Sequence, residues 1–167
     1  IYPYAVINVI VTAIGGENSI SGEKRFYPDV MIHNPDVLFI DYCLNDRGPG
    51  LEKASQAWES MIIKALDENI KVILLTASPD QRVDILDENS ILDQHGNQVK
   101  GLAEKYGTGL VDSYSLFRDE VKKGNKLPDF MSQVNHPNER GHWLIVQEIL
   151  TYFRAGKQEG RKAVRQE

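Results

Sequence analysis

Three short polar clusters in the sequence contain residue types that acyl-transfer chemistry needs. Two adjacent glycines, Gly15 and Gly16, allow the backbone to approach a ligand closely and to direct an N–H group into a pocket. Asn45 offers an amide that can donate a hydrogen bond to a developing oxyanion. His136 precedes a proline that restricts its loop, which suits a general base. Each cluster taken alone also fits an ordinary turn or helix cap.

Other reactive side chains in the sequence form weaker patterns. The glycine cluster is not a P-loop, because no Gly-Lys-Ser/Thr follows it at the required spacing. Cys43 is the only cysteine, which excludes an intrachain disulfide, and a cysteine at a strand end is more often a small buried hydrophobe than a nucleophile. The four histidines and this cysteine do not form a metal-ligand pattern. We therefore expect neither a metal nor an organic cofactor.

The clusters follow apolar runs that are typical of buried strands. These runs are rich in β-branched residues and lack polar alternation, which favours a parallel sheet covered on both faces. The predicted strands are Tyr4–Ile14, Val37–Tyr42, Lys71–Ala77 and Gly109–Asp112.

Helical patterns lie between these runs. Apolar residues recur every three or four positions from Leu51 to Leu66, and further helices are predicted within 87–106, over 116–123 and over 138–154. Alternating strands and helices predict a doubly wound, flavodoxin-like α/β fold, with a mostly parallel sheet in a three-layer α/β/α sandwich. Ligands of such sheets bind beyond the carboxyl ends of the strands, where the polar clusters stand.

Length and composition predict a single domain. The chain has 167 residues, of which 1–155 fit one domain and 156–167 form a polar tail. The net charge of -5 argues against a nucleic-acid partner, because phosphate binding needs a basic face. No apolar run is long enough to span a membrane. The chain begins at Ile1 and resembles a trimmed sequence, so an export signal could have preceded it and the compartment stays open.

In their order and placement, the three clusters resemble the SGNH hydrolase family of GDSL-type lipases and esterases. The matching residues are Gly16, Asn45 with Asp46, and His136 with Pro137, while Pro35-Asp36 leads the middle strand. The resemblance covers Tyr4 to about Phe153. It implies that the Gly16 N–H and the Asn45 amide form an oxyanion hole and that His136 is the base that activates a serine.

The sequence departs from that family pattern at three places. The nucleophile motif Gly-Asp-Ser is absent, and Ser19 and Ser21 stand at the oxyanion position instead, so we expect that a strand, its serine and a helix precede Tyr4 in the parent protein. Gln133 occupies the position of the aspartate that orients the histidine. Asp129 is nearby in sequence, but the loop would have to bend to bring it to His136, and a Ser-His dyad or a backbone carbonyl as the orienting group is equally possible. The glycine of the Gly-x-Asn-Asp motif is replaced by Cys43.

The resemblance implies a serine ester hydrolase that acts on a small acyl group through an acyl-enzyme. An acetyl ester of a carbohydrate is the expected substrate, by analogy within the family. The 167 residues without the serine are expected to be inactive. Two alternatives remain: a catalytically inactive module that binds a carbohydrate or acyl ligand, and a flavodoxin-like binding domain. The expected partner is a small-molecule ester, and the sequence predicts no oligomeric state.

Overall fold

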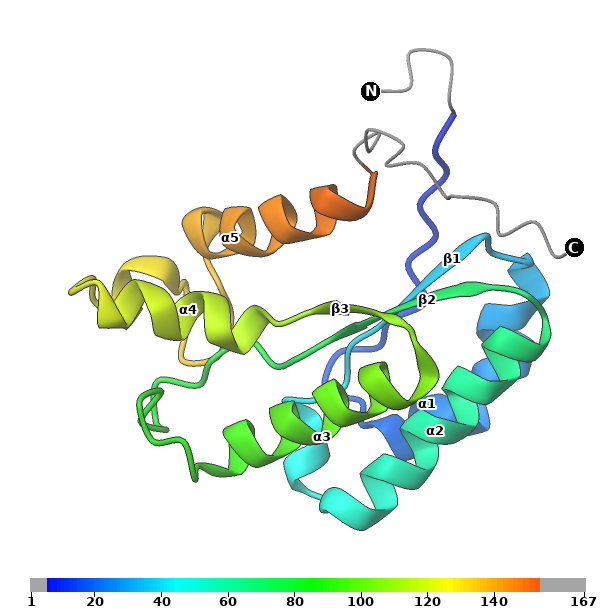
Figure 1. Cartoon of the computed structure of the whole chain (residues 1–167), viewed down its shortest axis with the longest axis horizontal. Coiled ribbons are helices and arrows are strands. Elements are labelled where there is room, and N and C mark those ends of the chain that lie inside the picture. The colour runs from blue at the N-terminus through cyan, green and yellow to red at the C-terminus, as the bar shows by residue number, and fades with distance from the viewer. Residues whose placement is uncertain (1–5, 154–167) are drawn as a thin grey trace, which may run out of the picture.

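A three-stranded parallel sheet forms the centre of the computed structural model, which describes residues 6–153 (Figure 1). The strands lie in the order β1-β2-β3 and are each one or two residues shorter than predicted. This arrangement confirms the predicted α/β class with a parallel sheet. The strands are β1 (Val37–Ile40), β2 (Lys71–Leu75) and β3 (Gly109–Val111).

The register of the sheet brings the ends of the strands together. In the first ladder Val37 pairs with Lys71, and in the second Ile73 pairs with Gly109. The central strand β2 is buried from its second residue onward, as the continuous apolar run predicts. Because all three strands are parallel, the loops that follow them emerge at one edge of the sheet.

Helices cover both faces of the sheet. In Figure 1, α1, α2 and α3 lie below the sheet and α5 lies above it, with α4 beside α5. The helices are α1 (Ser19–Lys24), α2 (Leu51–Asp67), α3 (Ile91–Tyr106), α4 (Ser113–Lys122) and α5 (Glu139–Ile149). Short helical turns are η1 (Phe26–Val30), η2 (Met31–His33), η3 (Asn45–Arg47), η4 (Leu127–Phe130) and η5 (Leu150–Phe153).

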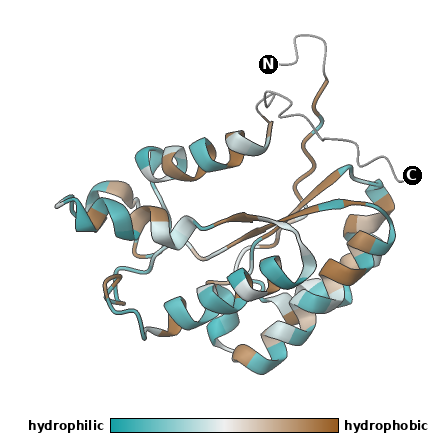
Figure 2. Cartoon of the chain, viewed as in Figure 1, coloured by the Kyte–Doolittle hydropathy of each residue, from teal (hydrophilic) through white to brown (hydrophobic). Residues whose placement is uncertain are grey.

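The core lies between the sheet and α2. The predicted stripe of this helix is buried at Ala54, Trp58, Met61, Ile62 and Ala65. In Figure 2 the strands are largely brown and α2 changes between brown and teal along its length, as an amphipathic helix does. Burial of large apolar side chains such as Met61 and Ile62 contributes about 1.5–3 kcal/mol each, so this contact contributes strongly to the packing beneath the sheet.

Cap residues account for where the helices begin and end. Ser90 caps α3 by accepting a hydrogen bond from the Asp93 N–H, and Gly107 ends it with a φ of +63°. Asp112 accepts from the Ser115 N–H, and α4 therefore begins three residues earlier than its apolar pattern predicts. The sequence prediction missed this cap because it assigned Asp112 to the preceding strand.

The predicted strand Tyr4–Ile14 is not a strand where the structure describes it. Residues 6–14 follow an extended course in Figure 1 and form no strand pair with any described residue, and residues 4 and 5 lie outside the described part. Six apolar side chains of this segment are more than half exposed, among them Val6 and Val9. The Val and Ile residues of this segment favour extended backbone, but a strand also needs a neighbour that pairs with its backbone and covers its side chains. Nothing in the described structure supplies one.

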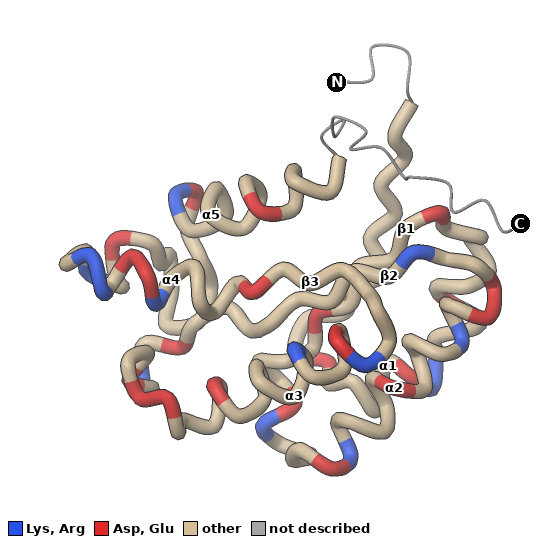
Figure 3. The backbone as a smooth tube through the Cα atoms, in the orientation of Figure 1, with Lys and Arg blue, Asp and Glu red and all other residues tan. Residues whose placement is uncertain are grey.

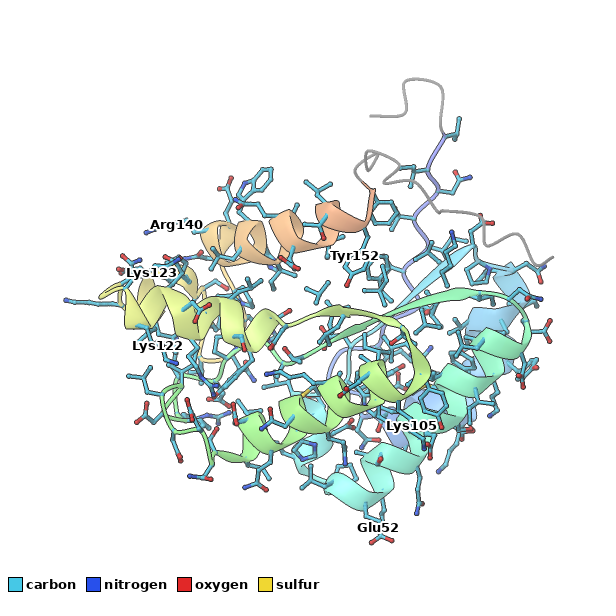
Figure 4. All side chains as sticks on the ribbon, viewed as in Figure 1. Glu52, Lys105, Lys122, Lys123, Arg140 and Tyr152 are labelled. Carbon is cyan, nitrogen blue, oxygen red and sulfur yellow. The ribbon has the colours of Figure 1, made fainter. Side chains whose placement is uncertain are left out.

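Tyr152 completes the outer edge of β3. This residue, labelled in Figure 4, lies in η5, just beyond α5. Its hydroxyl accepts a hydrogen bond from the Leu110 N–H at 2.8 Å and donates one to the Leu110 carbonyl at 2.7 Å. One side chain thereby satisfies an edge donor and acceptor that a further strand would otherwise pair.

The surface mixes charges of both signs. Figure 3 shows Lys and Arg interspersed with Asp and Glu over the helices and loops. Over residues 6–153, the surface in this view lacks the concentrated positive field that binds a polyanion. Among residues 6–153, no helix combines the length and the apolar character that crossing a membrane requires.

Candidate active site

The glycine loop forms a tight turn before α1. Gly16 has a φ of +78°, and the Glu17 N–H donates to the Ile14 carbonyl at 3.2 Å to close the turn. A Cβ added at Gly16 would meet no atom within 4 Å. Glycine is therefore required by the left-handed backbone and not by crowding, and the space in front of this backbone is open to a ligand.

Asn45 lies directly against this loop. It begins η3, the turn that follows β1, and its Nδ2 atom donates to the Glu17 carbonyl oxygen at 2.9 Å. An amide nitrogen carries two hydrogens, so a second N–H is available to a ligand. Although 28 residues separate the two partners, the structure places Asn45 next to the turn that contains Gly16. Their roles as oxyanion donors stay a prediction.

Asp46 holds η3 against the helices beneath it. Its fully buried carboxylate accepts from the Ser19 N–H at 2.8 Å and from Trp58 Nε1 at 2.6 Å. The first bond reaches the start of α1 and the second reaches α2. Asp46 thus fixes the glycine loop and Asn45 in relation to each other, since hydrogen bonds to charged groups contribute about 1.5–3 kcal/mol.

The loop after β2 contains a buried carboxylate that the sequence reasoning missed. Asp80 is 1% exposed and accepts from Arg82 Nε at 2.9 Å and from Arg47 Nη1 at 3.0 Å. Hydrogen bonds from Arg82, and then from Arg47, hold the pKa of this carboxyl well below its usual range. Asp80 therefore stays ionised and links the loops that follow β1 and β2.

His136 lies in a closed turn before α5. Met131 and Pro137 form an antiparallel bridge, and the His136 carbonyl accepts from the Ser132 N–H at 2.9 Å. Asn138 caps α5 by accepting from the Gly141 N–H at 3.2 Å, as its sequence position predicts. The His136 side chain is exposed, which leaves its ring accessible to a substrate.

The loop after β2 also holds the turn that carries His136. The Gln81 N–H donates to the Val134 carbonyl at 2.8 Å, and Gln81 Nε2 donates to the Gln133 carbonyl at 3.0 Å. The polar clusters that follow β1, follow β2 and precede α5 are thus joined by direct contacts at the carboxyl edge of the sheet.

No orienting partner of the imidazole is found in the structure. Among the described residues, no hydrogen bond joins the His136 ring to Gln133 or Asp129, and both of these side chains are exposed. Asp129 contributes its main-chain carbonyl, which accepts from Asn138 Nδ2 at 3.0 Å. The structure gives Asp129 a part in capping the loop rather than a contact with the base.

Cys43 is packed in the core and is unsuited to attack an ester. Its side chain is 1% exposed, and burial raises the pKa of the thiol to about 12. A thiol with such a pKa stays protonated at neutral pH, and the thiolate is the nucleophilic form. Ser19 is also fully buried, and its hydroxyl has no hydrogen-bond partner in the described part of the chain.

A metal centre and surface hollows are the other kinds of site that the described residues could offer. Within residues 6–153, no group of three or more His, Cys, Asp and Glu side chains is placed to hold a metal ion. Two hollows of about 880 and 650 Å³ share Val37, Ile70 and Lys71, which lie at the amino ends of β1 and β2. Ligands of open parallel sheets bind at the carboxyl ends, so these hollows lie at the wrong end for the polar clusters.

Comparisons with known proteins agree with this arrangement. Residues 2–144 match the model of the GDSL-like lipase/acylhydrolase family. No curated protein matches the sequence significantly.

Among solved structures, the acetylxylan esterase Axe2 from Geobacillus stearothermophilus is similar to the chain, with 22% identity and a TM-score of 0.72 over 81% of this chain and 67% of that one. The acetyl xylan esterase AlAXEase is also 22% identical, with a TM-score of 0.72 over 84% of this chain and 78% of that one. At such identities the likeness establishes the fold. The family match, which spans most of the sequence, establishes more: this chain belongs to the GDSL-like lipase/acylhydrolase (SGNH) family of carboxylic ester hydrolases.

Proposed function

We propose that the parent protein is a serine ester hydrolase whose acyl-enzyme forms at the carboxyl edge of this sheet. The observation that carries the proposal is the contact of the Asn45 amide with the turn that contains Gly16. Two donors on neighbouring loops, one from the backbone and one from a side chain, suit a carbonyl oxygen that becomes negatively charged. The expected partner is a small-molecule ester.

The reaction needs a serine that these 167 residues do not supply in a Gly-Asp-Ser motif. We propose that a strand–helix segment before Ile1 carries it and pairs between β1 and residues 6–14. Two observations support this placement: residues 6–14 are extended and unpaired, and Phe39 of the edge strand β1 is 40% exposed. A strand inserted there would give both segments a hydrogen-bonding neighbour.

The mechanism then follows from the positions of the side chains. His136 accepts the serine proton as the hydroxyl attacks the ester carbonyl, and the Gly16 N–H and Asn45 Nδ2 stabilise the oxyanion. Collapse of the intermediate breaks the ester bond, and the imidazolium returns its proton to the departing alcohol. Water, deprotonated by His136, hydrolyses the acyl-enzyme in the same way and restores the serine.

The proposed substrate is an acetyl ester of a carbohydrate. Support comes from the similar solved structures, which are named as acetylxylan esterases. Catalytic mutants of Axe2 replace a serine, an aspartate and a histidine of that enzyme. The present chain offers a histidine for such a set but has Gln133 where the family has its aspartate, so we propose a Ser-His pair in place of a full triad.

A binding module without catalysis is the second candidate. The absence of a Gly-Asp-Ser motif from the 167 residues favours it. The flavodoxin-like binding domain is no longer needed as an alternative, because the family match accounts for the same order of strands and helices.

Hydrolysis of p-nitrophenyl acetate by the full natural protein separates the candidates. We expect turnover from the natural protein, none from residues 1–167 alone, and a severe loss of kcat in His136→Ala. Sequencing the intact N-terminus should find Gly-Asp-Ser before Ile1. Turnover near wild type in His136→Ala would contradict the assignment of the base, and a natural protein that binds acetylated xylo-oligosaccharides without cleaving them would support the binding module.

A further inference from the structure

An ion pair between a partly exposed arginine and a buried aspartate connects the two halves of the candidate site, and neither residue belongs to the family motifs matched in the sequence. Arg47 ends the turn η3 that begins with Asn45, and its Nη1 atom lies 3.0 Å from Asp80 Oδ2. Its Nε atom donates to the Leu44 carbonyl at 2.9 Å, so the guanidinium bridges η3 to the loop after β2. The oxyanion side of the site is thereby tied to Asp80.

The turn that carries His136 is bound by Gln81, the residue that follows Asp80. Gln81 contacts the turn of His136 at two carbonyls, those of Val134 and Gln133. Ser78, in the same loop, donates to the Asn135 carbonyl at 3.5 Å. Between residues 133 and 135, each main-chain carbonyl of this turn accepts a hydrogen bond from the loop that contains Asp80.

The place of Gln133 in this network bears on the missing aspartate. In the family the residue three before the histidine orients the imidazole through its carboxylate. Here that residue is held by its main-chain carbonyl, which accepts from Gln81, while its own side chain is exposed. The constraint on His136 comes from the neighbouring loop through the backbone, instead of from a carboxylate on the ring.

We propose that Asp80 is a positioning residue that, through Arg47 and Gln81, sets the place of His136 relative to Asn45. The proposal rests on the ester hydrolysis proposed above. Asp80 touches neither substrate nor the reacting atoms. Its effect is geometric: it joins the loop of the oxyanion donor to the loop of the base, and a displacement of about 1 Å between such groups can reduce a rate about 100-fold.

Arg82 provides the matched comparison for Arg47. Both guanidinium groups bind the same carboxylate, but the Arg82 side chain is 66% exposed and belongs to the same loop as Asp80, whereas Arg47 reaches across from η3. Loss of Arg82 removes one positive charge beside Asp80 but leaves the connection between the two loops through Arg47 in place. If the ion pair has only a local role, Arg47→Ala and Arg82→Ala should lower kcat by similar factors. If it positions His136, Arg47→Ala should lower kcat more.

The test measures p-nitrophenyl acetate hydrolysis in the full natural protein carrying Arg47→Ala, Arg82→Ala, Asp80→Asn or Gln81→Ala, with Asp67→Asn on the exposed end of α2 as a control. We expect Arg47→Ala and Asp80→Asn to lower kcat about 10- to 100-fold with KM changed less than about threefold, while Arg82→Ala and Asp67→Asn stay within about threefold of wild type. In the double variant Asp80→Asn/Gln81→Ala the losses should not multiply, because both interrupt one connection. Equal losses in Arg47→Ala and Arg82→Ala would overturn the proposal.

NMR chemical shifts test this inference independently of ester hydrolysis, and they also reveal a variant that fails to fold. Amide ¹H–¹⁵N shifts of Val134 to His136 and the ring signals of His136 should move in Arg47→Ala but not in Arg82→Ala. Shifts confined to residues 80–82 would overturn the proposal even if the protein hydrolyses no ester. If Arg47→Ala fails to fold, Arg47→Lys, which keeps the charge but loses the planar fork, serves in both measurements.

Discussion

The side-chain amide of Asn45 donates to the main-chain oxygen of Glu17 at 2.9 Å, across 28 residues of sequence. This bond joins the turn after β1 to the glycine loop before α1. Beneath it, Asp46 binds the Ser19 N–H and Trp58 Nε1 and so anchors both sides of the contact. The predictions below follow from this geometry and from the turns that hold it.

Asn45→Ala should lower kcat of the full natural protein about 10²–10³-fold, the cost of one oxyanion donor. KM should change far less, because the amide interacts more strongly with the transition state than with the bound ester. Steady-state hydrolysis of p-nitrophenyl acetate measures both constants. A rise in KM with unchanged kcat would assign Asn45 to substrate binding alone.

Gly16→Ala should destabilise the protein by about 1–2 kcal/mol, because a φ of +78° is costly for a residue with a Cβ. Gly101→Ala is the matched control: a Cβ there also meets no atom within 4 Å, but Gly101 lies inside α3. Alanine should stabilise that helix by about 0.5–1 kcal/mol. Urea unfolding measures both free energies, and equal values for the two variants would rule out strain at Gly16.

The sequence predicted most of the architecture because the signals were local. Periodicity located α2, and Gly107 and Asn138 marked an end and a start through their own backbone and side-chain preferences. The apolar run before Gly15 misled for a physical reason: β-branched residues favour extended backbone, but strand pairing also requires a neighbour. Residues 6–14 are extended without one.

For the candidate site, too, the sequence predicted the residues that have a local signal and missed those that depend on contacts between loops. Asn45 follows β1 at the carboxyl edge of the parallel sheet, and the family resemblance predicted that the loop of Gly16 lies at the same edge, although the segment before Gly15 is not a strand of that sheet. Asp80 was missed because an aspartate after a proline resembles an ordinary turn residue, and its partner Arg47 lies 33 positions away. Contacts between loops depend on the packing of the whole domain, so no local pattern signals them.

His95 should make the protein less stable in acid. It is 1% exposed in α3, and its Nε2 atom has no hydrogen-bond partner among residues 6–153. Burial lowers its pKa below the usual value, an effect that nearby Asp46 opposes and Arg47 reinforces. The unfolded chain therefore binds the proton more readily than the folded protein does, so this part of the stability is present above about pH 6.5 and is lost as the pH falls below that value.

The measurement for His95 is the free energy of unfolding in urea between pH 5 and pH 8. One group can contribute a slope of at most about 1.4 kcal/mol per pH unit. His95→Gln should flatten the curve below about pH 6.5, because the substitution removes the group that the unfolded chain protonates more readily. Identical curves for His95→Gln and wild type would show that His95 does not titrate differently on folding.

Gly141→Ala should impair catalysis although it lies in a helix, where alanine is intrinsically favoured by about 1 kcal/mol over glycine. A Cβ at Gly141 would collide with the Phe130 carbonyl oxygen and lie 2.9 Å from the Pro137 side chain. Relief of that contact would move Pro137, and with it the adjacent His136, relative to the loop after β2 that contains Gln81. We therefore expect a net loss of stability and a fall in kcat of about tenfold or more, because misplacement of the base slows proton transfer. Urea unfolding and p-nitrophenyl acetate turnover of the full natural protein test this together. A variant that is more stable than wild type and equally active would show that the start of α5 can shift without moving His136.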